Sequence, residues 1–431
     1  MTTQMTFADW IRHHAHVLDS LDPQTPLDDL EPLSELIGDA RVVALGESAH
    51  YVREFYLLRH RLLRFLAERC GFTVYVMEAP FTEAHTIDKW IQGSPGTAEE
   101  VAAAGMAFNM GRRREMYDHL TWMRSHNQTA IIPLRFTGGG LPASGGSPMA
   151  ALEEVDLYLR QADPDALPLL EQATDLVKQY HSTATFEVLF RYSELDPASQ
   201  DVLTATLSRL LSRMETTSTY QRRGQRESDY GTALHHLRGV WYLDHFHRQY
   251  AGRGIPGEHP HALHDVFMAE SVIRLLRNGI NNTRIVLAYH NIHIQKTPLL
   301  KDGAIAGLPG GYHLAHTLGK DFVAIAVTNC AGHTAQMRPN SEKPLGFEIT
   351  SVPLPAPADE AVEAVFAGDA NPVFVNLRAA HPVISDAGSF QQMRMEDSFM
   401  DVPVFDAFDA IISIPHTSVS EDNDSRKEQN E

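Results

Sequence analysis

The chain has 431 residues, 43% of them hydrophobic, and a formal net charge of −19, which describes a globular protein able to bury a large core. No apolar run approaches the roughly 18 residues that span a bilayer, so we expect no membrane segment. The acidic balance argues against a nucleic-acid partner, because binding to phosphates requires concentrated Lys and Arg.

The N-terminal residues 1–20 include Asp9, Arg12 and several histidines, where a secretory signal needs an unbroken apolar centre. We therefore expect a cytoplasmic protein that begins with an amphipathic helix. Cys70 and Cys330 are too few for a disulfide framework or a cysteine-bound metal.

The segment from residue 41 to residue 78 predicts a strand, a helix and a second strand. Residues 42–45 are continuously apolar, residues 52–69 repeat apolar side chains at helical spacing, and residues 73–77 are β-branched or aromatic. Two parallel strands joined by a crossover helix have both carboxyl ends at one edge of the sheet. We therefore expect Glu47, His50 and Glu78 to meet at that edge, where open α/β sheets bind ligands.

A third strand is predicted over residues 130–136, followed by a stretch rich in glycine and proline. Residues 138–143 satisfy a loose G-x-G-x-x-A pattern, but a dinucleotide site requires a helix to begin there, and Pro142 and Pro148 oppose one. We expect a mobile loop at the same sheet edge, in a position to act as a lid.

Residues 149–250 carry apolar side chains at helical spacing throughout, and further strand-like runs begin at residues 284, 322, 373 and 410. The sequence therefore predicts an α/β fold with a mainly parallel central sheet flanked by helices and an inserted all-helical subdomain. The expected divisions are residues 1–148 and 251–417 for the two parts of the α/β core, 149–250 for the helical insertion, and 418–431 for a disordered tail.

The strand-like run at residues 284–289 ends at His290, which we also expect at the edge with Glu47, His50 and Glu78. Carboxylates beside imidazoles raise the imidazole pKa and fix its tautomer, as a general base acting on water requires. Two histidines and two glutamates are equally able to bind zinc or iron. The residue types alone leave metal-dependent and metal-free hydrolysis equally open.

An ordered set of motifs resembles the erythromycin esterase family over roughly residues 30 to 415. The matching positions are Gly46-Glu47-Ser48-Ala49-His50, Glu54, Arg59, Gly71-Phe72, Glu78, Asp265 with Met268-Ala269, the run from His290 to Pro298, Met393-Arg394, and Phe408 to Ile412.

The resemblance implies hydrolysis of a macrolide lactone ester with no metal and no cofactor. By position, His50 is the general base that activates water, Glu47 orients it, and Glu78 and His290 complete the catalytic group. The supporting or substrate-binding residues implied in the same way are Arg59, Glu54, His293, His264 and Asp265.

The expected partner is a small-molecule macrolide whose amino sugar is cationic, which the acidic balance favours. The family has arginine where this chain has His264, and often Gly-x-Asp where this chain has its glycine-rich stretch, so the precise substrate stays open. The alternatives are a metal-dependent hydrolase, or a non-catalytic protein of a related fold that binds haem or a metal.

Overall fold

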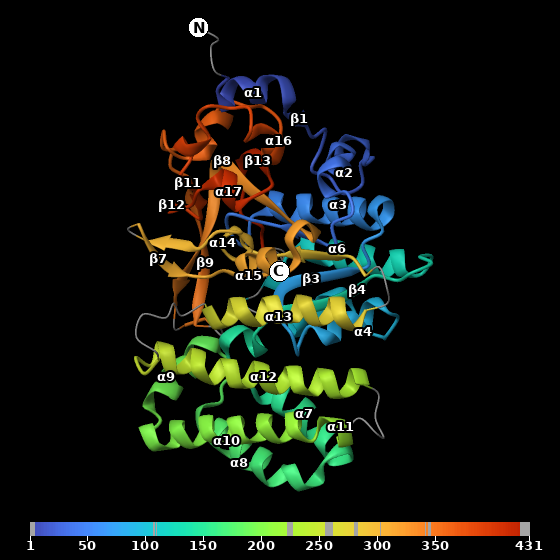
Figure 1. Ribbon diagram of the computed structural model, residues 1–431, viewed down its shortest axis with the longest axis vertical. Coiled ribbons are helices and arrows are strands. Elements are labelled where there is room, and N and C mark those ends of the chain that lie inside the picture. Colours follow the sequence, from blue (N-terminus) through green and yellow to red (C-terminus); the bar gives the residue numbers. More distant parts are fainter. Residues whose placement is uncertain are drawn as a thin grey trace, which may run out of the picture.

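A computed structural model gives the structure of the chain (Figure 1). It describes residues 5–106, 108, 110–221, 227–254, 262–279, 283–301, 303–340, 342–343 and 346–422.

A central sheet runs through the molecule, and most of its neighbouring strands are parallel. Its order is β1 (His16–Val17), β10 (Val373–Asn376), β13 (Ala410–Thr417), β8 (Phe322–Pro339), β2 (Val42–Leu45), β5 (Ile285–Ala288), β3 (Val74–Pro80) and β4 (Arg135–Gly140). All pairs from β13 to β4 are parallel, whereas β10 pairs antiparallel with both β1 and β13. Strand β9 (Phe347–Pro353) pairs antiparallel with the far end of β8.

Helices cover both faces of this sheet. Val43 and Leu45 of β2 pack on one face with α2 (Pro32–Ile37), α3 (Arg53–Cys70), α4 (His85–Ile91), α5 (Ala98–Gly105) and α6 (Arg114–Asn127). Val42 and Ala44 pack on the other face with α1 (Phe7–His14), α13 (Ala262–Asn278), α15 (Gly310–Leu318), α16 (Leu377–Ala380) and α17 (Val404–Ala407). Successive strand residues point to opposite faces, so a strand covered on both sides is apolar throughout. The predicted α/β fold is confirmed.

The middle of the chain forms a layer of helices below the sheet in Figure 1. These helices are α7 (Met149–Ala162), α8 (Leu167–Tyr180), α9 (Thr185–Glu194), α10 (Pro197–Thr216), α11 (Ser218–Gln221) and α12 (Glu227–Tyr250). They bury their own apolar cluster, and a small second cluster around Phe246 and Phe267 joins α12 to α13. This grouping supports the proposal that residues 149–250 form a helical subdomain.

The strand predicted over residues 130–136 is wrong in position, because β4 begins at Arg135 and includes the first glycines of the predicted mobile loop. A Cβ atom on Gly139 would lie 2.5 Å from the Tyr289 hydroxyl, and one on Gly138 would lie 2.3 Å from the carbonyl oxygen of Ala79. Only glycine leaves room for the edge strand to approach its neighbours so closely.

The predicted disorder from residue 418 onward is wrong for residues 418–422. The backbone N–H of Arg53 donates to the carbonyl of Ser418 (2.9 Å), and that of Ser420 donates to the carbonyl of Tyr51 (2.7 Å). Between these two residues, Val419 packs against the core. Detaching the segment would expose this apolar side chain, and that cost opposes the chain entropy that the segment would gain. Residues 423–431 lie outside the described residues.

Two small antiparallel pairs complete the described strands, namely β6 (Leu299–Lys301) with β7 (Ala304–Gly307) and β11 (Gln392–Met395) with β12 (Ser398–Asp401). A short helix, α14 (Asn291–Ile294), follows β5 directly. No helix in the described part of the chain is both long and apolar enough to cross a membrane.

Candidate active site

Three neighbouring parallel strands end side by side, and each places an ionisable residue at its carboxyl end. Leu45 of β2 lies opposite Ala288 of β5, so Glu47 and His290, two residues further along each chain segment, leave the sheet together. Glu78 belongs to β3 on the other side of β5. The sheet register therefore brings the predicted residues to one edge.

Glu47 fixes both a histidine and an arginine. Its Oε1 accepts a hydrogen bond from His50 Nδ1 at 2.7 Å, and its Oε2 lies 2.7 Å from Arg59 Nη2. The Glu47 and Arg59 side chains are buried, whereas that of His50 is 24% exposed. Burial disfavours the Glu47 carboxylate, but the Arg59 cation and the His50 hydrogen bond outweigh it and lower the pKa of Glu47. The position of the His50 ring is therefore set by Glu47 through Nδ1, while part of the ring remains accessible to solvent.

Glu78 lies between two imidazoles. Its Oε1 is 3.7 Å from His50 Nε2 and 3.6 Å from His293 Nε2, and its Oε2 accepts the backbone N–H of His290 at 2.8 Å. Burial opposes its charge, but His50 and His293 dominate and lower the pKa of Glu78 to about 2. Glu78 is a carboxylate at every pH at which an ester hydrolase works.

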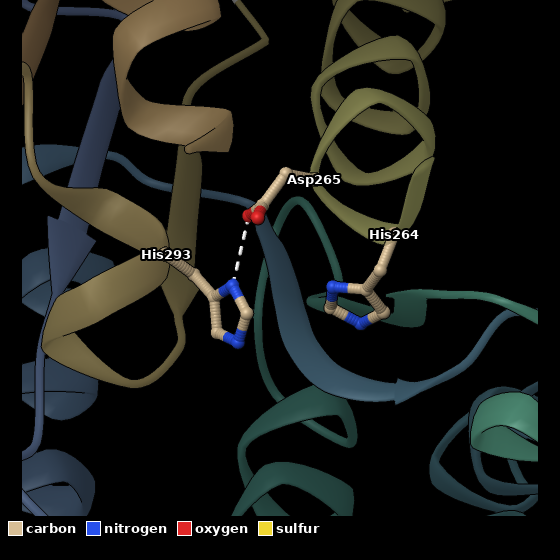
Figure 2. A group of neighbouring side chains, drawn as sticks. All are labelled: His264, Asp265 and His293. Carbon is tan, nitrogen blue, oxygen red and sulfur yellow. Dashed lines mark hydrogen bonds and ion pairs between the residues drawn. The ribbon is translucent and has the colours of Figure 1, made fainter. Parts of the chain in front are cut away.

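A second group of side chains adjoins Glu78 (Figure 2). His264 and Asp265 lie at the start of α13, and His293 belongs to α14. His293 Nδ1 donates to Asp265 Oδ1 at 2.8 Å, and the same oxygen accepts the backbone N–H of Gly310 at 3.0 Å. Figure 2 shows the imidazole of His264 turned toward that of His293, and their ring centres are 5.0 Å apart.

The two histidines that contact carboxylates are cations at neutral pH. Burial opposes a charge on His50, but Glu78 and Glu47 together raise its pKa to about 9. Burial likewise opposes a charge on His293, but Asp265 and Glu78 raise its pKa to about 9. Positive and negative groups therefore alternate from Arg59 through Glu47, His50, Glu78 and His293 to Asp265, which balances the charge of a buried site.

His290 is the neutral imidazole of the site. Burial, reinforced by the His50 cation, lowers its pKa to about 4. Its Nδ1 accepts the backbone N–H of Ile292 at 3.2 Å, so the proton of the neutral ring is on Nε2. That Nε2 is buried and has no hydrogen-bond partner among the described residues, and the ring centre is 5.6 Å from that of His50. A proton donor is thus available beside the histidine that faces solvent.

Of the predicted supporting residues, Glu54 lies apart from this cluster. Its two carboxylate oxygens accept hydrogen bonds from the backbone N–H and the hydroxyl of Ser418, at 2.7 and 2.8 Å. Glu54 therefore ties the segment after β13 to the start of α3. This contact gives Glu54 a structural role and does not require the residue to take part in catalysis.

Two residues that sequence reasoning passed over lie at the site. Tyr289 is buried between Gly139 and the ring of His293, and no residue in the described part of the chain gives its hydroxyl a hydrogen-bond partner. Its position one residue before His290, at the end of a strand, was the available signal. Glu396, in the tight turn between β11 and β12, has its pKa raised by burial while the His50 cation partly opposes the shift. No local pattern marks Glu396.

Among the residues that the structure describes, two sets have donor atoms close enough together to hold a metal ion. In each of the sets Glu47, His50, Glu78 and His264, Asp265, His293, one ligand atom per residue lies within 4.8 Å of the others. In both sets the Nδ1 of one histidine donates to a carboxylate, which leaves the Nε2 of that ring as the nitrogen that could bind an ion. An ion at either set would have to displace the proton of one histidine whose pKa is raised, His50 in the first set or His293 in the second.

Comparison with known proteins identifies the family. The model of the erythromycin esterase family matches residues 67–417. Erythromycin esterase type II of Escherichia coli is 33% identical over 424 residues, which cover 97% of this chain and 99% of that protein. Erythromycin esterase type I of Escherichia coli is 25% identical over 411 residues, covering 94% and 97% of the two chains.

The fold is shared as well. A histidine-to-asparagine mutant of the erythromycin esterase EreC, solved in its open conformation, superposes with a TM-score of 0.82 at 24% identity, covering 93% of this chain and 97% of that chain. The resemblance inferred from the motifs is thereby confirmed over almost the whole length. The chain belongs to the erythromycin esterase family and is a carboxylic ester hydrolase.

Proposed function

We propose that the protein opens the macrolactone ester of erythromycin-like macrolides, with His50 as the general base and without a metal ion. One observation carries the proposal. His50 is 24% exposed, whereas Glu47 and Arg59 are buried, and its Nδ1 is held by Glu47. Its Nε2 lies 3.7 Å from Glu78 Oε1, and its ring centre lies 5.6 Å from that of the neutral His290.

The roles follow from the hydrogen bonds. Because Glu47 accepts the Nδ1 proton of His50, the free imidazole has its lone pair on Nε2, which takes a proton from water. The resulting hydroxide adds to the ester carbonyl. The Nε2–H of His290 donates to the oxyanion that forms, and protonated His50 returns its proton to the alcohol oxygen as the ester bond breaks.

The charges predict how the rate depends on pH. With a pKa of about 9, His50 is an imidazolium in the free enzyme at pH 7 and must lose this proton before it accepts one from water. The value of kcat/KM should therefore rise from pH 7 toward pH 9. A base with the unperturbed histidine pKa of about 6.5 would already be about three-quarters deprotonated at pH 7, so kcat/KM would rise little above that pH.

We propose a macrolide with a cationic amino sugar as the substrate. The chain carries a formal net charge of −19, and Glu396, a further acidic side chain, lies within electrostatic reach of His50. Negative potential over the site raises the local concentration of a cation and speeds its encounter with the enzyme.

Incubation with a panel of macrolides in ¹⁸O-labelled water, followed by mass spectrometry, tests the function. Addition of one water with ¹⁸O in the new carboxylate is expected for 14-membered lactones that carry an amino sugar. Unchanged macrolide masses after incubation with the folded protein would contradict the proposal. Loss of the sugar or transfer of another group would assign a different reaction.

A metal-dependent hydrolase is the second candidate, favoured by the two sets of clustered donor atoms. The set formed by His264, Asp265 and His293 adjoins Glu78, so an ion held there would lie beside the catalytic residues. Metal binding at that set requires the loss of the His293 proton, which the pKa of about 9 disfavours at neutral pH. Chelation distinguishes the two candidates.

A further inference from the structure

A cavity of 480 Å³ lies between α12, α13 and α15 and shares no residue with the catalytic cluster. Figure 1 shows α13 running between α12 and the central sheet. Leu234, Val266 and Ile273 supply apolar walls, and Arg238, Arg274 and Arg277 supply positive charge. A cavity of this size accommodates a small organic molecule.

Arg274 is a cation without a counter-charge. Among the described residues, no carboxylate lies within ion-pair distance of its guanidinium, which lies over the ring of Phe81 at 5.1 Å from the ring centre. Its Nε is buried, and none of the described residues forms a hydrogen bond with it. Burial lowers the pKa of Arg274 to about 10, because nothing nearby offsets the cost of its charge. By contrast, the buried guanidinium of Arg61 pairs with Asp29 at 2.5 Å.

The other charged groups of the cavity leave it positive. Arg238 pairs with Glu215 at 2.8 Å, and Arg277 is exposed at the rim. Glu270 lies one helical turn before Arg274, and its Oε1 accepts a hydrogen bond from the hydroxyl of Tyr242 at 3.0 Å. The lining thus contains three arginines and one glutamate, in a chain that is strongly acidic as a whole.

We propose that this cavity binds an organic anion, whose carboxylate or phosphate group pairs with Arg274 and whose apolar body packs against Leu234, Val266 and Ile273. A guanidinium pairs with two oxygens of one carboxylate or phosphate through parallel hydrogen bonds. The anion supplies the missing counter-charge, and burial of the rest of the ligand against the apolar walls contributes favourable free energy of binding. The site is additional to the ester hydrolase activity and does not depend on it.

Calorimetric titration with three matched probes tests the site: 1-naphthoate, 1-naphthyl phosphate and the neutral 1-naphthalenemethanol. At least one anion should bind tenfold or more tightly than the neutral probe, and the ratio between the two anions distinguishes a carboxylate site from a phosphate site. Equal affinity for all three probes would show that the cavity is merely apolar and would overturn the proposal.

Variants locate the binding. Arg274→Gln should reduce the affinity for the preferred anion to that for the neutral probe, whereas Arg209→Gln, on an exposed part of α10 away from the cavity, should leave it unchanged. Without ligand, Arg274→Gln should melt at the same temperature as the parent or higher, because it removes an uncompensated charge.

A marked fall in that melting temperature would assign Arg274 to the stability of the fold and overturn the proposal, as would undiminished affinity in Arg274→Gln. Ile273→Trp fills the cavity and gives an independent check. It should abolish binding of both anions while leaving ester hydrolysis intact, and retained binding would place the anion elsewhere.

Discussion

Replacing Glu78 by glutamine should shift the acidic limb of the pH–rate profile to lower pH. Glu78 is isosteric with glutamine, and the change removes the carboxylate that lies 3.7 Å from His50 Nε2. The pKa of His50 is raised to about 9 against burial, and the charge of Glu78 is the largest single interaction that raises it, ahead of the hydrogen bond and the charge of Glu47. Without that charge, His50 should lose its proton at a lower pH.

The distance sets the size of the shift. Two unit charges 3.7 Å apart attract each other by about 4 kcal/mol at an effective dielectric constant of about 20, which corresponds to about three pH units. Partial solvent access at His50 reduces this value, so a shift of about one to three units is expected. The plateau rate should also fall, because an imidazole with a lower pKa accepts a proton from water less readily. In addition, the backbone N–H of His290 loses its bond to a charged carboxylate.

Initial rates of macrolide hydrolysis between pH 5 and pH 10 give kcat/KM for the parent, for Glu78→Gln and for the control Glu54→Gln. Glu54 contacts Ser418 and lies outside the cluster around His50 and Glu78, so its substitution should not shift the acidic limb of the pH–rate profile. NMR titration of the His50 ring reports the same pKa without reference to rate. An unshifted limb in Glu78→Gln, together with an unshifted His50 titration, would refute the electrostatic reasoning.

Four further outcomes are expected. His50→Ala should lower kcat by a factor on the order of 10² to 10⁴ while its circular dichroism spectrum is retained, and a near-parental kcat in the folded variant would rule out His50 as the base. His290→Ala should also lower kcat, because it weakens oxyanion stabilisation. Prolonged chelation should leave turnover unchanged, and a loss restored by zinc or manganese would establish the metal-dependent alternative. Macrolides with a charged amino sugar should have higher kcat/KM than uncharged analogues, and added salt should narrow the difference; equal values at low salt would contradict an electrostatic preference. Gly139→Ala should destabilise the fold by about 1 to 3 kcal/mol, since its Cβ would lie 2.5 Å from the Tyr289 hydroxyl, whereas Gly388→Ala, with open space around it, should change the melting temperature little.

The sequence alone determined the positions of the candidate catalytic residues along the sheet. Continuous apolar runs such as residues 42–45 and 285–288 predict strands covered on both faces, and such strands are parallel because helices connect them. Parallel connection sends Glu47, Glu78 and His290 to one edge whatever the details of packing. The ordered motifs indicate the family from the sequence alone.

Tertiary structure decided where the glycine-rich stretch lies. Residues 138–140 predict a loop by composition, but they form part of β4, because Tyr289 and the backbone of Ala79 occupy the space where side chains would be. A local pattern shows that glycine is present, whereas the reason for it lies on strands distant in the sequence. The order of residues 418–422 likewise depends on contacts with the start of α3.

Tertiary structure also decided the protonation states. Glu47 and His50 are three residues apart, and their pairing follows from the sequence, but the pKa of about 9 at His50 also requires Glu78 from another strand. His293 pairs with Asp265 across 28 positions, only because α13 packs beside the end of β5. Charge interactions act through space and depend on burial, which a linear sequence does not specify, so the residues of the site are predictable and their charges are not.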